Sequence, residues 1–198
     1  MQAVHNRRLH ANTMIPETSL HTSRLDLVPA TLEHLVYEQT DLRALESLLH
    51  AAIPPSWPPA MLTGEVLAEF IRMKKEGSDP NFILWYWILN DACETGRTLI
   101  GSGGISSAPG AKNTVVLGYS VLEPFQCRGY ATEAVSHMIP VIFSDPSVRR
   151  IIATTFPDLH TSIRVLEKTG FVCTGRGHAS EGMEEGTLWY VNEKLDEP

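Results

Sequence analysis

Residues 115–143, with the sequence VVLGYSVLEPFQCRGYATEAVSHMIPVIF, predict a strand, a tight loop and a helix in direct succession. β-Branched and aromatic residues dominate residues 115–121, as is usual in strands. Residues 123–131 form the loop. Apolar residues then recur at i, i+3 and i+4 spacing, which predicts a helix from near Thr132 to about Phe143. The three elements together place the start of a helix just beyond the end of a strand.

The loop has the features of a phosphate-binding site at a helix N-terminus. The first N–H groups of a helix lack intrahelical partners, and the aligned peptide dipoles add a partial positive charge there. Gly129 has no Cβ and Ala131 has a small side chain, so a phosphate can approach the backbone closely. Arg128 adds a permanent positive charge with forked donors. The loop therefore predicts a pyrophosphate site, although it matches neither the Walker lysine loop nor the dinucleotide fingerprint.

Composition and charge limit the classes of function. The chain has 198 residues, which predicts one domain. Its formal net charge of −7 argues against a nucleic-acid-binding face. No apolar run is long enough to span a membrane. The three cysteines form no C-x-x-C pair and the histidines form no metal-ligand pattern, so we expect no metal, no disulfide framework and a cytoplasmic, reducing location.

The rest of the sequence predicts the order of the other elements. Residues 1–20 are expected to be a flexible N-terminal segment. The helix over 63–75 is expected to bury Val66, Phe70 and Met73, and Pro140 is expected to kink or shorten its helix. Strands are predicted at 24–28, 81–90, 97–106, 115–121, 150–155, 171–174 and 187–191, and helices from 31 to 49 with a break at Thr40-Asp41, at 63–75, at 132–143 and at 161–169.

Two motifs resemble a known family. Residues 126–134, QCRGYATEA, and 162–171, SIRVLEKTGF, are similar to those of GCN5-related N-acetyltransferases (GNAT), and most similar to the ribosomal-protein N-terminal acetyltransferase (RimJ/RimL-like) branch. The resemblance implies one α/β (α+β) domain over residues 21–198, with a mixed, mostly antiparallel sheet, a V-shaped split and helices on both faces. It implies acetyl-CoA as cosubstrate, its pyrophosphate held by the loop amides and its pantetheine arm paired with the splayed strand. The cofactor-binding residues implied are Tyr119, Ser120, Val121, Gln126, Cys127, Arg128, Gly129, Tyr130, Ala131 and Thr132.

The resemblance also implies a reaction, the direct transfer of an acetyl group to a primary amine such as a protein N-terminus, an amino acid or a small amine. Ser162 matches the family's helix serine near the coenzyme sulfur and is the candidate catalytic acid. The other interpretation is that Ser162 caps the helix, a role serine readily fills. Leu159 and Val116 stand where many relatives carry asparagine and an acidic residue. The base is therefore sought in the acidic loop at residues 181–185 or in an ordered water.

Several alternatives stay open. Leu159 and Val116 favour an acyl-CoA-binding module without transferase activity as the second interpretation. A covalent route through one of the three cysteines is less favoured, because none has a recognisable base or orienting partner. Trp57, in a proline-rich loop, either lines the acceptor pocket or covers an edge of the core. We expect no nucleic-acid or membrane partner, and a homodimer is compatible with the sequence.

Overall fold

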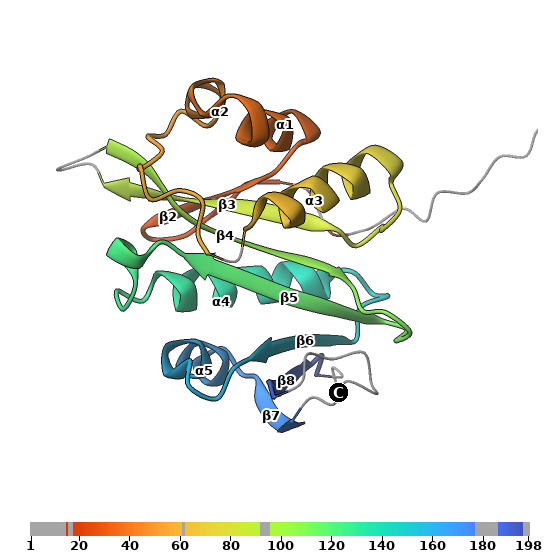
Figure 1. The fold of residues 1–198 in the computed structure, drawn as a ribbon. Coiled ribbons are helices and arrows are strands. Elements are labelled where there is room, and N and C mark those ends of the chain that lie inside the picture. Colours follow the sequence, from red (N-terminus) through yellow and green to blue (C-terminus); the bar gives the residue numbers. More distant parts are fainter. Residues whose placement is uncertain (1–14, 16–17, 61, 92–95, 177–185, 196–198) are drawn as a thin grey trace, which may run out of the picture.

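The computed structural model describes residues 15, 18–60, 62–91, 96–176 and 186–195, so most of the N-terminal segment predicted to be flexible lies outside it. Within the described residues, eight strands form one sheet and five α-helices cover it (Figure 1). None of these helices is long and apolar enough to cross a membrane. The strands are β1 (Leu20–His21), β2 (Leu25–Pro29), β3 (Ile83–Asp91), β4 (Gly96–Ser107), β5 (Thr114–Val121), β6 (Arg150–Thr155), β7 (Val172–Arg176) and β8 (Leu188–Glu193). The helices are α1 (Leu32–Thr40), α2 (Leu42–Leu49), α3 (Gly64–Glu76), α4 (Tyr130–Ser144), α5 (His160–Lys168) and the 3-10 turn η1 (Glu123–Phe125).

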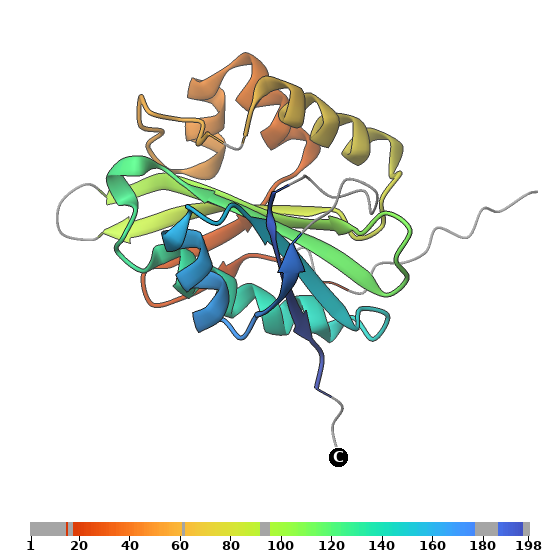
Figure 2. The same cartoon turned by 60° about the horizontal axis from the view of Figure 1, so that its bottom comes forward.

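The sheet is mixed and mostly antiparallel, with the strand order β1-β2-β3-β4-β5-β6-β8-β7. Among the described strand pairs, β5 and β6 alone run parallel, and α4 connects them. Helices α1, α2 and α3 cover one face of the sheet, and α4 and α5 cover the other (Figure 2). The predicted α/β architecture with helices on both faces is confirmed.

Asp41 explains why the apolar pattern from 31 to 49 forms two helices. Its backbone is extended, with φ −156° and ψ 91°, and this ends α1. Its carboxylate accepts hydrogen bonds from the backbone N–H groups of Arg43 at 3.0 Å and Ala44 at 3.1 Å, which caps the start of α2. The predicted break at this point is confirmed.

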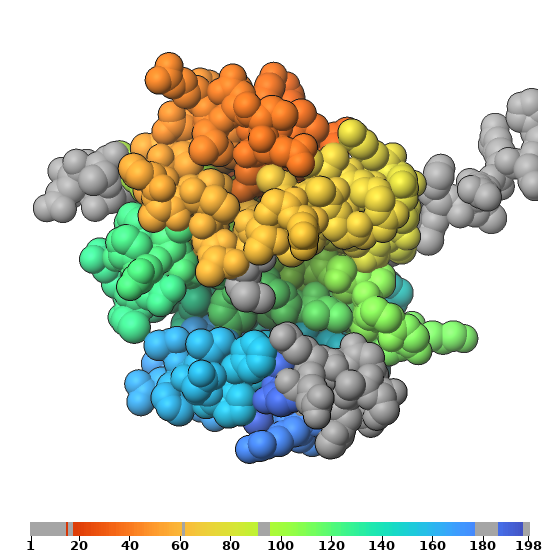
Figure 3. All heavy atoms as spheres, viewed as in Figure 1, coloured from red at the N-terminus to blue at the C-terminus, as the bar shows by residue number. Residues whose placement is uncertain are grey.

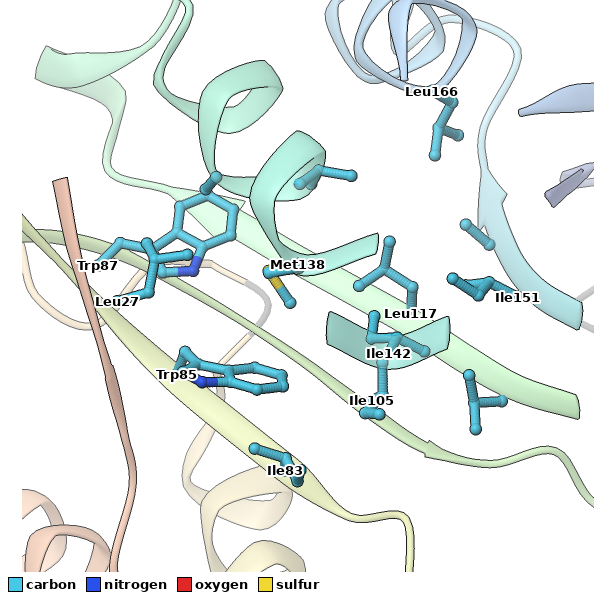
Figure 4. Close-up of a cluster of buried hydrophobic side chains, with 14 of the residues drawn as sticks. Leu27, Ile83, Trp85, Trp87, Ile105, Leu117, Met138, Ile142, Ile151 and Leu166 are labelled. Atoms are coloured by element: carbon cyan, nitrogen blue, oxygen red, sulfur yellow. The ribbon is translucent and has the colours of Figure 1, made fainter. Parts of the chain in front are cut away.

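The larger core lies between the sheet and α4. Alternate residues of β3 face this side, among them Trp85 and Trp87, which are fully buried. They share this core with Met138 and Ile142 of α4 (Figure 4). Gly103 on β4 leaves room for the indole of Trp87, because a Cβ at position 103 would lie 2.5 Å from Trp87 Cζ2. This glycine therefore serves the packing of two neighbouring strands.

The second core lies between the opposite face of the sheet and helices α1, α2 and α3. In α3, Leu67 and Ile71 are buried, whereas Val66, Phe70 and Met73 are only partly buried. The predicted buried stripe of α3 is therefore wrong, because the buried residues each lie one position after the predicted Val66 and Phe70. Both rows carry apolar residues at helical spacing, so the sequence pattern alone could not choose between them.

Helix α4 begins earlier than predicted, and it ends within one residue of the predicted Phe143. It begins at Tyr130 rather than near Thr132, because Gly129 acts as its N-cap. It also continues past Pro140 to Ser144, so the predicted shortening is wrong. Pro140 has no N–H to donate to the carbonyl of Ser136, but Ser136 is exposed and water can satisfy that carbonyl.

The end of α5 agrees with its sequence pattern. Gly170 has φ 87°, in the left-handed region that favours glycine after a helix. The N–H of Phe171 donates to the carbonyl of Leu166 at 3.0 Å, and both side chains are buried in the same core. This turn directs the chain from α5 into β7.

Candidate functional site

Strands β5 and β6 separate part-way along their length. Their parallel pairing ends at Val116 and Ile152. β5 nevertheless continues to Val121 and stays paired with β4, and β6 continues to Thr155. The predicted V-shaped split therefore lies between residues 117–121 of β5 and 153–155 of β6. On the side of the split, this part of β5 pairs with none of the described strands, so its main chain can pair with an extended ligand.

The first turn of α4 follows the open end of β5 after residues 122–129. Gly129 is the N-cap of α4 with φ 84°, and no side chain caps this turn. The N–H groups of Tyr130, Ala131 and Thr132 lie in the first turn, where the helix itself provides no acceptor. These N–H groups, the helix dipole and the exposed Arg128 fit an anion such as pyrophosphate. A side chain at position 129 would be strained, because this φ is one that L-residues rarely adopt.

Arg24 holds this loop against the start of β2. Its Nη2 lies 2.7 Å from Glu133 Oε2, and its Nε donates to the same oxygen at 2.7 Å. Its Nη1 donates to the carbonyl of Arg128 at 3.0 Å, and its guanidinium lies 4.5 Å from the ring centre of Tyr130. No local pattern in the sequence indicates this contact, because 109 residues separate Arg24 from Glu133. Arg24 and Glu133 thus form a latch, which fixes the position of the loop before α4 and of the first turn of that helix.

Glu133 is the centre of the latch. Its Oε1 accepts hydrogen bonds from Thr22 Oγ1 at 2.6 Å, from Ser23 Oγ at 2.9 Å and from the backbone N–H of Arg24 at 2.9 Å. Burial would raise the pKa of Glu133, but the hydrogen bonds from Thr22, Arg24 and Ser23 outweigh burial and lower that pKa to about 2. The carboxylate is therefore ionised at neutral pH, and Arg24 neutralises the charge that would otherwise repel a phosphate.

A tyrosine and a serine meet across the split. Ser162 of α5 lies in the first turn of its helix, and its Oγ is 3.2 Å from the hydroxyl oxygen of Tyr119 on β5. The N-cap of α5 is Leu159, with no side-chain cap hydrogen bond, so Ser162 does not cap this helix. Tyr119 also stacks on Trp87, with ring centres 6.3 Å apart. The burial of Tyr119 raises its pKa to about 12, with the hydrogen bond to Ser162 opposing that change. At neutral pH the Tyr119 hydroxyl therefore keeps its proton.

A hollow of about 290 Å³ opens on the opposite face of β5, between α3 and strands β4 and β5. Figure 3 shows this face of the molecule, where α3 (yellow) borders β5 (green). Val116, Gly118 and Ser120 of β5 line the hollow together with Val66 and Phe70 of α3. Val66 and Phe70, which are only partly buried against the core, thus form a wall of this hollow.

A second hollow, of about 660 Å³, lies over the strands at the C-terminal end of the chain. Val116 lines both hollows, which shows that they adjoin. Three charged residues, Arg150, Arg176 and Glu193, line the second one. The two hollows therefore differ in chemical character.

The other candidate residues are placed as follows. Trp57 is buried, its indole Nε1 donates to Glu38 Oε1 at 2.8 Å, and it does not line either hollow, which favours its interpretation as a core residue. Cys127 and Cys173 are exposed free thiols. Cys93 and the acidic loop at residues 181–185, where a base was sought, lie outside the described residues. Within the described part of the chain, no group of three or more His, Cys, Asp or Glu side chains could hold a metal ion.

Comparisons with known proteins complete the description. The sequence profile of the acetyltransferase (GNAT) domain matches residues 24–172. The comparison with curated proteins found no significant match. Among solved structures, the ribosomal-protein-S5-alanine acetyltransferase from Vibrio fischeri is 21% identical, with a TM-score of 0.59 over 91% of this chain and 99% of that one. RimL, a ribosomal L7/L12 α-N-protein acetyltransferase solved with coenzyme A, is 15% identical, with a TM-score of 0.58 over 90% and 97%. The microcin C7 self-immunity acetyltransferase MccE, solved with acetyl-CoA and AMP, is 14% identical, with a TM-score of 0.55 over 87% and 93%.

Proposed function

Because the chain belongs to the GNAT family of acyl-CoA-dependent acetyltransferases, we propose that it transfers the acetyl group of acetyl-CoA directly to a primary amine. One observation carries this proposal: the unpaired edge of β5 runs toward an uncapped helix start. A strand edge suits an extended amide-containing arm, and a helix start suits a pyrophosphate. Together the two features match the two parts of the coenzyme.

The residues of the chain divide the binding of the coenzyme between them. We assign the pyrophosphate to the loop and first turn of α4, and the pantetheine arm to the main chain of β5. Gln126 ties the two sites together, because its Nε2 donates to the carbonyl of Val121 at 2.9 Å. The residues assigned to the coenzyme are Tyr119, Ser120, Val121, Gln126, Cys127, Arg128, Gly129, Tyr130, Ala131 and Thr132.

Ser162 is the residue that we assign to the proton transfer. Acetyl-CoA supplies an activated acetyl thioester, from which the sulfur leaves when the amine nitrogen bonds to the acetyl carbon. Ser162 donates its hydroxyl proton to that sulfur, and Tyr119 replaces the proton through the 3.2 Å contact between the two hydroxyl oxygens. Tyr119 has a proton to give at neutral pH, because its pKa is about 12, and the same high pKa makes it regain a proton from water once the thiol has left.

The acceptor amine must also lose a proton when it is acetylated. No ionisable carboxylate, histidine or lysine is among the described residues that line the hollow beside β5. Val116, at the position where many relatives carry an acid, is half-buried and apolar. We therefore assign the proton to water, which predicts that kcat/KM rises with pH as more of the amine becomes neutral.

The acceptor class follows from the similar proteins. Two solved structures that share the fold are named for the acetylation of ribosomal proteins, which favours a protein N-terminus among the primary amines. The homodimer and the cytoplasmic location stay predictions from the sequence.

Two measurements test the proposal. Acetyl-CoA should raise the thermal midpoint of the protein, and thiol release from acetyl-CoA should then depend on an added amine. Replacing Ser162 with Ala should lower kcat while leaving the affinity for acetyl-CoA within about twofold. Binding without turnover on peptides, amino-acid amides and alkylamines would support the coenzyme-binding module instead. Absence of acetyl-CoA binding would overturn both interpretations.

A further inference from the structure

We infer that the acceptor carries an apolar, uncharged group beside its primary amine, and that the hollow between α3 and β5 selects this group. The inference rests on the proposed acetyl transfer and specifies its acceptor. It depends on the position of the hollow, on the residues that shape it and on the chemistry of its wall.

The hollow adjoins the split through one short piece of backbone. Val116, Gly118 and Ser120 alternate along β5 and line the hollow, whereas Leu117 and Val121 belong to the core on the other face. Residues 117–121 of β5, which include Gly118 and Ser120, also form the unpaired edge at the split. An acceptor in the hollow therefore approaches β5 from the face opposite to Tyr119 and Ser162.

Glycines at two paired positions create the hollow. Leu84, Gly104 and Gly118 lie side by side on β3, β4 and β5. A Cβ at Gly104 would lie 2.5 Å from the carbonyl oxygen of Ile83, so no side chain fits there. Gly118 has open space around the position of a Cβ, with nothing within 4 Å. The floor of the hollow thus lacks the two side chains that would normally fill this row of the sheet.

The wall of the hollow is apolar and uncharged. No lining residue among those that the structure describes is acidic or basic, and the polar lining residues are serines and Tyr119, whose ring stacks on Trp87 in the core on the other face of the sheet. The buried carboxylate of Glu38 is not part of the wall, and it already accepts hydrogen bonds from Trp57 and Tyr86. A second ammonium group on the acceptor would find no counter-charge here and would lose its hydration. The apolar lining residues are Leu62, Val66, Phe70, Phe82, Leu84, Ile105 and Val116.

Hexylamine and cadaverine form a matched pair of acceptors for the test. Both have seven non-hydrogen atoms and a primary amine, but the terminal methyl group of hexylamine is replaced by a second ammonium group in cadaverine. We expect kcat/KM, measured by thiol release at saturating acetyl-CoA, to be about 10- to 100-fold higher for hexylamine, because burying an unpaired polar group has a cost of this order. Norleucinamide and ornithinamide provide the same comparison for an α-amine.

A substitution in the wall should reverse part of this preference. Val66→Asp places a carboxylate in the wall, in the first turn of α3, where a negative charge is compatible with the helix dipole. We expect the ratio of kcat/KM for hexylamine to that for cadaverine to fall about tenfold or more. Ala68→Asp is the matched control, because it adds the same charge to the same helix at an exposed position outside the hollow. The control should leave the ratio unchanged, and the thermal shift with acetyl-CoA shows that both variants are folded.

The outcomes separate the inference from the proposed function. Equal kcat/KM for hexylamine and cadaverine, or a ratio that Val66→Asp and Ala68→Asp change equally, overturns the apolar acceptor. Absence of acetylation of all four amines and of peptides, by a protein that binds acetyl-CoA, overturns the proposed transfer itself. Preference for the apolar member of each pair, with a shift only in Val66→Asp, supports both.

Discussion

Replacing Glu133 with Gln should remove the charge of the latch that holds the loop before α4, to which we assign the pyrophosphate. The variant keeps an oxygen that can accept from Thr22 and Ser23 but loses the ion pair with Arg24. The pKa of Glu133 is about 2 in the folded protein against an ordinary 4.5. This difference corresponds to about 3 kcal/mol of stability at neutral pH. Because the Arg24 side chain is 43% exposed, solvent screens the pair, and we expect a loss of about 1–2 kcal/mol.

The loss of stability in Glu133→Gln should depend on pH, and it should be larger at neutral pH than in acid. A carboxylate whose pKa is lowered by folding stabilises the protein fully above its unfolded pKa, here 4.5, and loses that effect as pH falls toward its folded pKa of about 2. Urea unfolding should therefore show the full difference between wild type and Glu133→Gln at pH 7 and less than half of it at pH 3. Glu123→Gln, in the exposed 3-10 turn η1 at the start of the loop, makes the same chemical change without a latch and should cost under about 0.5 kcal/mol. An equal loss for Glu133→Gln at the two pH values would refute the assignment to an ionic latch.

Three further predictions concern other contacts. Tyr119→Phe removes the hydroxyl that contacts Ser162 and should lower kcat about tenfold. The dissociation constant of acetyl-CoA, measured by calorimetry, should change less than twofold. An unchanged kcat would show that Tyr119 takes no part in the proton transfer. Gly103→Ala places a Cβ 2.5 Å from Trp87, and urea unfolding should show a loss of about 1–3 kcal/mol; a neutral effect would mean that the indole moves freely. Burial raises the pKa of Glu38 despite the hydrogen bonds from Tyr86 and Trp57, so ionisation of Glu38 destabilises the fold as pH rises above about 4.5. Glu38→Gln should therefore gain stability relative to wild type between pH 4 and pH 7, and a constant difference over that range would contradict the buried carboxylate.

Local patterns in the sequence predicted the elements well because each pattern has a local cause. The strand-loop-helix unit and the stop at Gly170 depend on residues within a few positions of one another. Helix α4 begins two residues before its predicted start, since the usual search for a Ser, Thr, Asp or Asn cap does not detect Gly129 in a left-handed conformation. The missing side-chain cap is the same feature that leaves the helix N–H groups open to a ligand.

Contacts between distant segments could not be predicted in the same way. The sequence singled out Tyr119 and Ser162 separately, but their contact across the split depends on how α5 packs against β5. The latch between Arg24 and Glu133 and the hollow over Gly104 and Gly118 likewise depend on which strands are neighbours. The glycines at 101–104 were visible in the sequence, but their two functions follow only from the register. Gly103 makes room for Trp87, and Gly104 leaves the floor of the hollow open.

The most direct test of the account compares acetyl-CoA with S-acetylpantetheine, which has the same thiol arm but no pyrophosphate and no nucleotide, by calorimetry on wild type and Gly129→Val. If the start of α4 binds the pyrophosphate, wild type should bind acetyl-CoA at least about 100-fold more tightly than S-acetylpantetheine. Gly129→Val should remove most of that difference and leave the affinity for S-acetylpantetheine within about twofold, because it changes only the loop and not the edge of β5. Equal binding of the two ligands by wild type, or a full difference retained in Gly129→Val, would contradict the central claim.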